Sequence, residues 1–303
     1  MKVFVTGGSG FIGTNVVSLL LSEGYSVIAL ARSDKSEAKL KGMGANVSVI
    51  RGELTDADAL KKGTSESDGV IHLGFIHEFD RYDECCKIDR KACEVMLQTL
   101  KGSNRPFIYT SGTLTLPTYR ECDENDTVDV SGSGPFERAI TEQHCLSYKD
   151  QGVKAMIVRL PPTVHAVGDR GFIPVLIASA KKNKVSAYVG EGKNVWSAVK
   201  RDDAAKLYIL AFEKGASGKA YHAVAEGIET KEIANKIAKK LDLPTKSVPF
   251  EKAGEYLGFL GTFFSWDNRI KSEITRKDLG WEPKGATLLE DLENEYYYGN
   301  IFG

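Results

Sequence analysis

The stretch that decides the fold is Thr6-Gly7-Gly8-Ser9-Gly10-Phe11-Ile12-Gly13. It lies between an apolar run at residues 3–5 and a helical pattern that begins near Phe11. Gly7 allows a tight turn from strand to helix, Gly10 lets the backbone approach a pyrophosphate, and Gly13 lets the helix pack closely on the sheet. Unpaired amides at the helix start then face an anion, so we expect a dinucleotide to bind here, a simple tight turn being the alternative. The predicted contacts come from Gly7, Ser9, Gly10, Phe11, Ile12 and Gly13.

Outward from this turn, short apolar runs alternate with longer helical patterns. The expected strands cover residues 2–6, 25–31, 46–50, 69–73, 106–110 and 153–159. The expected helices, with apolar residues at helical spacing, cover residues 15–23, 83–100 and 137–151. Parallel strands need a crossover connection, and each interval is long enough to hold one helix. The alternation therefore predicts an α/β fold, a doubly wound parallel sheet of the Rossmann type with helices on both faces.

A second region is expected to begin near residue 165, because prolines and glycines crowd together after Pro161. Asp202 and Asp203 open a helical pattern over 202–214, where acidic side chains suit the positive end of a helix. Residues 221–224 form a strand candidate that rejoins the sheet, and Thr230 is the expected N-cap of a helix over 231–241. The predicted dinucleotide-binding domain is 1–165, rejoined by 197–225. The predicted substrate-binding region, smaller and C-terminal, is 166–196 and 226–303.

Composition points to a small-molecule partner. The 303 residues include 40 lysines and arginines against 41 aspartates and glutamates, a net charge of -1. That balance provides no field to gather nucleic acid or an anionic membrane surface. No apolar run approaches the ~18 residues of a membrane span, and no targeting segment is visible. The five cysteines have no metal-ligand spacing, so we expect reduced thiols, no metal site and a cytoplasmic location.

The end of the second strand faces the adenosine ribose in such folds and so selects the cofactor. Arg32 falls about 20 residues after the glycine turn and is followed by Ser33. A guanidinium and a hydroxyl suit a 2′-phosphate, which favours NADP(H). The alternative leaves Arg32 solvated and Asp34 on the ribose hydroxyl, so that NAD(H) is also accommodated.

Further motifs follow along the chain: Gly52-Glu53-Leu54-Thr55-Asp56, Val70-Ile71-His72-Leu73-Gly74, Tyr109-Thr110-Ser111-Gly112, Arg159-Leu160-Pro161-Pro162-Thr163-Val164, and Val195-Trp196-Ser197-Ala198-Val199 before Arg201-Asp202-Asp203-Ala204-Ala205. Together with the glycine turn they resemble the extended or atypical short-chain dehydrogenase/reductases, over nearly the whole chain. The resemblance implies that Glu53 and Leu54 flank the adenine. It implies further cofactor contacts from Leu73, Gly74, Phe75, Ser111, Pro161, Thr163 and Val164, the last three beside the nicotinamide amide.

The chain departs from that family at its usual catalytic residues. The family relies on a Tyr-x-x-x-Lys pair, in which the lysine lowers the tyrosine pKa so that the hydroxyl can exchange a proton with the substrate. None of the 12 tyrosines has a lysine four positions later. By the resemblance, the two positions fall on Gly134 and Arg138, the serine position on Gly112, and the asparagine position on Asp89. The tyrosine hydroxyl is therefore missing, while a cation remains.

Two explanations follow. In the first, Arg138 keeps the contact with the nicotinamide ribose, another group donates the proton, and the chain is an NADPH-dependent oxidoreductase that reduces a small aldehyde or ketone. In the second, the fold is a catalytically weak NADP(H)-binding sensor or scaffold. The resemblance also includes sugar-nucleotide epimerases and dehydratases, but these normally need the tyrosine base.

Three residues are candidates for the missing proton donor. His165 lies just beyond the sixth strand, at the carboxyl edge where ligands of open α/β folds bind, and an imidazole donates near neutral pH. His77 follows the fourth strand, and Thr113 has a hydroxyl near the expected oxygen site. The alternative is that each is an ordinary polar residue.

A cluster of aromatic residues near the C-terminus leaves two interpretations open. Phe259, Phe263, Phe264 and Trp266 either roof an apolar substrate pocket or belong to the core or a subunit contact. A homodimer would be unsurprising in the superfamily that the chain resembles.

Overall fold

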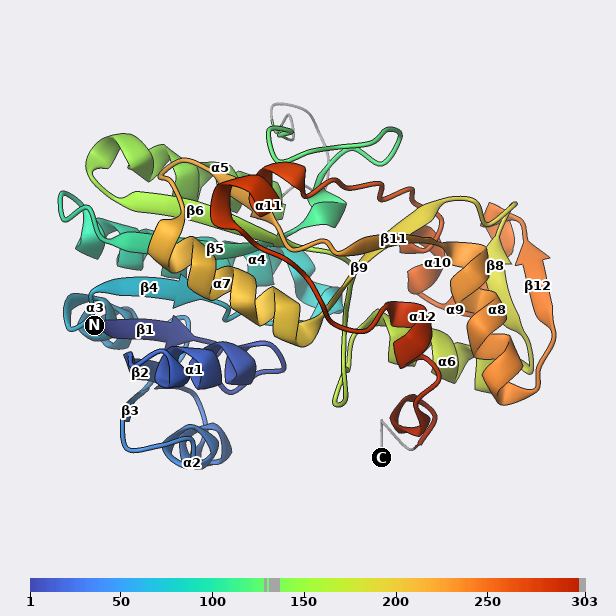
Figure 1. The fold of residues 1–303 in the computed structure, drawn as a ribbon, viewed down its shortest axis with the longest axis horizontal. Coiled ribbons are helices and arrows are strands. Elements are labelled where there is room, and N and C mark those ends of the chain that lie inside the picture. Colours follow the sequence, from blue (N-terminus) through green and yellow to red (C-terminus); the bar gives the residue numbers. More distant parts are fainter. Residues whose placement is uncertain (128–129, 131–136, 300–303) are drawn as a thin grey trace.

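The computed structural model describes residues 1–127, 130 and 137–299. Its centre is a sheet of seven strands that pair in parallel (Figure 1). The strands are β1 (Lys2–Thr6), β2 (Ser26–Ala31), β3 (Val47–Arg51), β4 (Gly69–His72), β5 (Pro106–Gly112), β6 (Lys154–Leu160) and β10 (Ala220–His222). Their spatial order, β10-β6-β5-β4-β1-β2-β3, reverses direction between β1 and β4. Such a reversal opens a crevice at the carboxyl ends of the strands, where ligands of these folds bind.

Helices cover both faces of this sheet, which confirms the doubly wound α/β prediction. The helices of the first half are α1 (Gly13–Ser22), α2 (Asp34–Lys41), α3 (Ala57–Ser65), α4 (Tyr82–Leu100) and α5 (Glu137–Leu146). Side chains alternate along β1, so Val3 and Val5 join one buried cluster with α1, and Phe4 joins the other with α4. The apolar strand runs are thus buried on both sides, as a parallel sheet requires.

The predicted helices over 15–23, 83–100, 202–214 and 231–241 are confirmed, with ends shifted by at most two residues. The prediction over 137–151 is divided, since α5 ends at Leu146 and a 3₁₀ helix continues over Ser147–Gln151. The helix α7 (Arg201–Lys214) carries Asp202 and Asp203 in its first turn, as expected.

The predicted N-cap at Thr230 is wrong by one residue. The cap of α8 (Thr230–Leu241) is Glu229, and Thr230 already belongs to the helix. Its hydroxyl is committed elsewhere, because it donates to the side-chain oxygen of Asn194 at 2.8 Å.

A second lobe lies beyond the carboxyl ends of the large sheet (Figure 1). Its strands are β7 (Thr163–His165), β8 (Ser186–Val189), β9 (Val195–Lys200), β11 (Glu226–Glu229) and β12 (Thr245–Val248). They form a three-stranded sheet in the order β11-β9-β7 and the pair β12-β8. Its helices besides α8 are α6 (Phe172–Asn183), α9 (Ala253–Leu257), α10 (Leu260–Phe263) and α12 (Leu288–Asp291). The helix α11 (Glu273–Leu279) instead packs against α7 and β10 of the large sheet.

Some of the aromatic residues of the second lobe form part of its core. Trp196 and Phe264 are fully buried, with ring centroids 4.8 Å apart in an edge-to-face arrangement. Phe172 and Phe263, both partly buried, stack beside them, which favours the core interpretation for Phe263 and Phe264. Phe259 is exposed and Trp266 only partly buried, so the core interpretation does not extend to these two residues. Within the described ranges, no helix combines the length and the apolarity needed to cross a bilayer.

Candidate functional site

The glycine turn has the geometry that its sequence predicts. Gly7 adopts a positive φ of 69°, and a Cβ there would lie 2.7 Å from the amide nitrogen of Gly74. A Cβ on Gly13 would lie 2.1 Å from the carbonyl oxygen of Gly7, so only glycine lets α1 start against this turn. The first turn of α1 carries no acidic residue. The positive end of the helix is therefore compatible with an anion.

The end of β4 is held against this turn. Thr6 accepts a hydrogen bond from the amide of Gly74 at 3.0 Å, and its carbonyl accepts one from Leu73 at 3.2 Å. Leu54 lies close behind, since a Cβ on Gly74 would approach its Cδ2 to 3.1 Å. Backbone segments after β1, β3 and β4 thus meet at the crevice where the strand order reverses.

The adenosine side of the crevice contains an exposed cation. Arg32 follows β2, is exposed, and forms no hydrogen bond or ion pair within the described part of the chain. Ser33 caps α2 by accepting a hydrogen bond from the amide of Ser36. Asp34 lies 2.8 Å from a guanidinium nitrogen of Arg51. The carboxylate that could accept a ribose hydroxyl is therefore already beside a cation, whereas Arg32 is not engaged.

A second cation near the glycine turn was missed by sequence reasoning. Lys39, on α2, donates from Nζ to the carbonyl oxygen of Ser9 at 2.8 Å. Its only signal in the sequence is its place on the helix that follows Arg32.

Some of the buried polar atoms that lack a partner in the described structure lie near the ends of β5 and β6, while others, such as Oε2 of Glu124 and Nε2 of His165, lie elsewhere. The hydroxyls of Ser111 and Thr163 and the Nε of Arg138 are buried without a hydrogen-bond partner in the described structure. Buried polar groups are nearly always paired in folded proteins, so unpaired ones mark places where a ligand completes the bonding. Ser111 is the next-to-last residue of β5, Thr163 follows Pro161 after β6, and Val164 is partly exposed beside it. A dinucleotide with its nicotinamide at this edge fits both the turn and these atoms.

Arg138 extends from α5 to the end of β5. Its Nη2 donates to the carbonyl oxygen of Thr110 at 2.8 Å, and its guanidinium carbon lies 4.2 Å from the centre of the Phe75 ring. The neighbouring Gly112 leaves open space, because only the Leu160 carbonyl would come within 4 Å of a Cβ there. Gly134, at the expected tyrosine position, lies outside the described residues.

A buried network lies beneath this edge. Asp89 accepts a hydrogen bond from the hydroxyl of Tyr109 at 2.7 Å and pairs with Nε2 of His72 at 3.0 Å. Burial disfavours the imidazolium, but Cys93 and Asp89 raise the pKa of His72 to about 10. His72, Asp89 and Cys93 are close enough together to resemble a metal site. Both ring nitrogens of His72 are already used, since Nδ1 lies 2.6 Å from the Thr6 hydroxyl, which favours a structural role.

The structure brings His77 and Arg138 together but holds Thr113 in another network. The rings of Phe75 and His77 meet edge to face, 5.1 Å apart. Desolvation and the nearby Arg138 lower the pKa of His77, although its side chain borders solvent. Thr113 is fully buried and donates its hydroxyl proton to Asn268 at 2.9 Å. That hydroxyl is not directed to a ligand.

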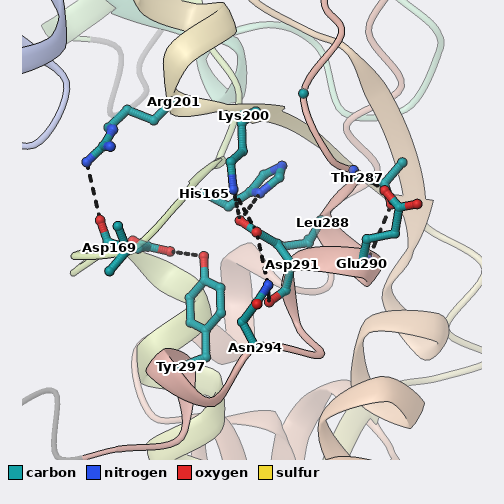
Figure 2. A network of polar contacts seen from close by, with 12 residues as sticks. His165, Asp169, Lys200, Arg201, Thr287, Leu288, Glu290, Asp291, Asn294 and Tyr297 are labelled. Carbon is teal, nitrogen blue, oxygen red and sulfur yellow. Dashed lines mark hydrogen bonds and ion pairs between the residues drawn. The ribbon is translucent and has the colours of Figure 1, made fainter.

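His165 also belongs to a separate network (Figure 2). Its Nδ1 lies 2.8 Å from the carboxylate of Asp291, which also accepts hydrogen bonds of 2.7 Å from Lys200. The side chain is fully buried, its Nε2 has no partner in the described structure, and burial lowers its pKa. Figure 2 shows α12 joined to β7 through Asp291 and His165. Beyond α12, Tyr297 donates a hydrogen bond to Asp169 in the loop after β7. This arrangement fastens the C-terminal segment to the second lobe.

Sequence reasoning also missed Tyr82. It is the first residue of α4, partly exposed, with its ring 6.0 Å from that of Phe75. Burial raises the pKa of Tyr82 to about 12, while the Arg138 cation lowers it. A search for lysine four positions later passes over this residue, because its cation comes from a different helix.

Comparisons with known proteins agree with this geometry. Residues 3–225 match the model of the NAD dependent epimerase/dehydratase family. An uncharacterized protein of Saccharomyces cerevisiae is 50% identical, covering 98% of this chain and 99% of its own length. A 2-alkyl-3-oxoalkanoate reductase of Stenotrophomonas maltophilia is 27% identical, covering 84% of this chain and 80% of its own. The solved structure of a dTDP-glucose 4,6-dehydratase of Streptomyces venezuelae with NAD bound has a TM-score of 0.77 at 18% identity, covering 99% of this chain and 100% of that one.

Proposed function

We propose that this chain, which belongs to the NAD dependent epimerase/dehydratase family, reduces the carbonyl group of a small aldehyde or ketone with a nicotinamide cofactor. The observation that carries the proposal is the set of unpaired buried atoms on Ser111, Arg138 and Thr163, at the same sheet edge as the glycine turn. These groups are polar, buried and positioned for the nicotinamide end of a dinucleotide. The relative in Stenotrophomonas maltophilia, a ketone reductase by name, supports the same reaction class.

The preferred cofactor is NADP(H). Arg32 is exposed just after β2 and forms no hydrogen bond or ion pair with the described residues, and Asp34 is already beside Arg51. Lys39 adds a second positive charge near the glycine turn. Two cations suit a 2′-phosphate, whereas the one neighbouring carboxylate, Asp34, is exposed and pairs with Arg51.

Each part of the chain then has a chemical task. The turn at residues 6–13 binds the pyrophosphate through its amides, and Arg138 anchors the nicotinamide ribose. When bound, the reduced nicotinamide supplies a hydride. The open space beside Gly112 admits the substrate, and holding its carbonyl near the cofactor contributes much of the rate. Pro161 and Val164 border the amide.

Two other functions are alternatives to carbonyl reduction. A catalytically weak NADP(H) sensor is supported by the absence of the Tyr-x-x-x-Lys pair in the sequence. A sugar-nucleotide epimerase or dehydratase is supported by the fold of the Streptomyces venezuelae enzyme, but it would need a base that replaces the missing tyrosine.

The test combines turnover with binding. Purified protein is incubated with NADPH and a panel of aldehydes, ketones and 2-alkyl-3-oxo acids, and the loss of NADPH absorbance is followed while cofactor binding is titrated separately. We expect turnover of at least one carbonyl class. Binding without turnover would support the sensor, and conversion of a nucleotide sugar would support the third alternative.

A further inference from the structure

We propose that the hydroxyl of Tyr82 donates the proton to the substrate oxygen, a task for which position 134 offers only glycine. This inference rests on the proposed carbonyl reduction. It concerns a residue outside the family's usual catalytic positions, and it starts from the surroundings of Arg138.

Tyr82 and Arg138 meet across a shared aromatic ring. The guanidinium carbon of Arg138 lies 4.2 Å from the centre of the Phe75 ring, and the centre of the Tyr82 ring lies 6.0 Å from that of Phe75. Tyr82 comes from α4 and Arg138 from α5, so the pair is assembled by helix packing rather than by spacing within one helix. The phenol lies close enough to the cation for Arg138 to influence its ionisation.

Tyr82 is also accessible to a substrate. Its side chain is partly exposed at the start of α4. The start of α4 follows the loop that carries Phe75 and His77 from the carboxyl end of β4, which is the ligand-binding edge of the sheet. By contrast, the hydroxyl of Thr113 and the ring of His165 are fully buried.

The proton-transfer step balances. As the hydride forms a bond to the carbonyl carbon, the π electrons of the carbonyl move to its oxygen, which takes the proton from the Tyr82 hydroxyl. The carbonyl is reduced to an alcohol, and the nicotinamide is oxidised. The phenolate that remains on Tyr82 is stabilised by the Arg138 cation and recovers a proton from water.

The protonation states favour Tyr82 over His77. A donor must hold its proton at neutral pH, and burial raises the pKa of Tyr82 to about 12. Desolvation and Arg138 lower the pKa of His77 below its ordinary value, so its ring is mostly neutral at pH 7. Arg138 thus penalises the imidazolium and stabilises the phenolate.

The experiment compares Tyr82→Phe with Tyr119→Phe. Tyr119 is 82% exposed, so its substitution serves as the matched control. The assay uses saturating NADPH and a carbonyl that the wild-type protein reduces. We expect Tyr82→Phe to lower kcat by about 10²-fold or more, with NADPH binding unchanged, and Tyr119→Phe to leave kcat unchanged. His77→Asn should keep kcat within a few-fold of wild type.

The outcomes separate this inference from the proposed function. If the wild-type protein is active and Tyr82→Phe has the same kcat, the Tyr82 assignment is overturned and the proposed function stands. If His77→Asn loses its activity while Tyr82→Phe keeps it, His77 is the proton donor. A wild-type protein that reduces no carbonyl overturns both proposals. If Tyr82→Phe does not fold, a fluorinated tyrosine at position 82 replaces it. Fluorination makes the phenol more acidic, so the pH above which kcat declines should be lower than in the wild-type protein. An unchanged pH profile overturns the assignment. Arg138 and Cys86 are the ionisable groups facing this phenol.

Discussion

Arg159 donates a hydrogen bond from Nη1 to Nε2 of His222 at 3.1 Å, deep in the large sheet. Because a guanidinium can only donate, Nε2 must accept, and the proton of the neutral ring lies on Nδ1. That nitrogen in turn donates to the carbonyl of Lys271 at 2.8 Å. The pairing therefore holds His222 as a neutral imidazole.

Stability should depend on this histidine below neutral pH. Burial and Arg159 lower the pKa of His222 to about 3 in the folded chain, whereas an unfolded histidine has a pKa of roughly 6.5. At a pH between these two pKa values, His222 binds a proton in the unfolded state but not in the folded state. The free energy of unfolding therefore falls as the pH drops below about 6.5. At pH 5 the loss from this group is about 2 kcal/mol. Urea unfolding at pH 7.5 and pH 5 should show a smaller difference for His222→Gln than for wild type. An equal difference in the two proteins would contradict the prediction.

Arg32→Ala should weaken NADPH binding far more than NADH binding. The substitution removes the exposed guanidinium at the end of β2, and a 2′-phosphate loses a charge-assisted contact that a ribose hydroxyl never made. We expect at least a tenfold rise in the Kd for NADPH, corresponding to about 1.4 kcal/mol. Fluorescence titration with both cofactors measures this, and equal losses for the two would defeat the 2′-phosphate argument.

Gly13→Ala should disrupt the cofactor turn. The new Cβ would lie 2.1 Å from the Gly7 carbonyl oxygen, so the turn or the helix must move. We expect a lower Tm and loss of measurable dinucleotide binding. Gly254→Ala is the matched control, because it also places a methyl group on a helix but meets no atom within 4 Å. If Gly13→Ala bound cofactor as tightly as Gly254→Ala, the predicted turn would not be the binding site.

Asp291→Asn should destabilise the second lobe. The buried carboxylate balances Lys200 and bonds to His165, and its loss leaves the lysine without a countercharge. Removing one partner of such a pair costs roughly 2–4 kcal/mol, somewhat less than for a fully buried pair because Lys200 remains partly exposed. Chemical denaturation measures this cost. Glu191→Gln removes a carboxylate from an exposed pair with Lys193 and should leave the unfolding midpoint unchanged.

The large sheet was predictable because its signals are local. The strand containing Val3, Phe4 and Val5 is buried on both faces, so its residues form a continuous apolar run that the sequence displays directly. The glycine turn was predictable for a similar reason, since Gly7 and Gly13 each satisfy a steric requirement that no other residue meets.

The rest of the site depends on contacts between distant segments. Thr113 is 155 residues from its partner Asn268, and His165 is 126 residues from Asp291, so neither engagement has a signal in local sequence. Tyr82 and Arg138 meet only because α4 packs beside α5. Thr230 shows why an exact helix boundary is hard to predict. Its hydroxyl donates to Asn194 instead of capping the helix, and the helix begins one residue earlier than expected.

The seventh strand also constrains how the chain is made. Residues 220–222 pair with β6 only after the segment from β7 to α7 has been synthesised. Until then β6 is an open edge with unsatisfied amides and carbonyls, and such edges recruit other strands. A ribosome-bound or truncated chain that ends near residue 165 should therefore aggregate, whereas one that extends past residue 222 covers β6 with β10, a strand of three residues that becomes the new, much shorter edge of the sheet.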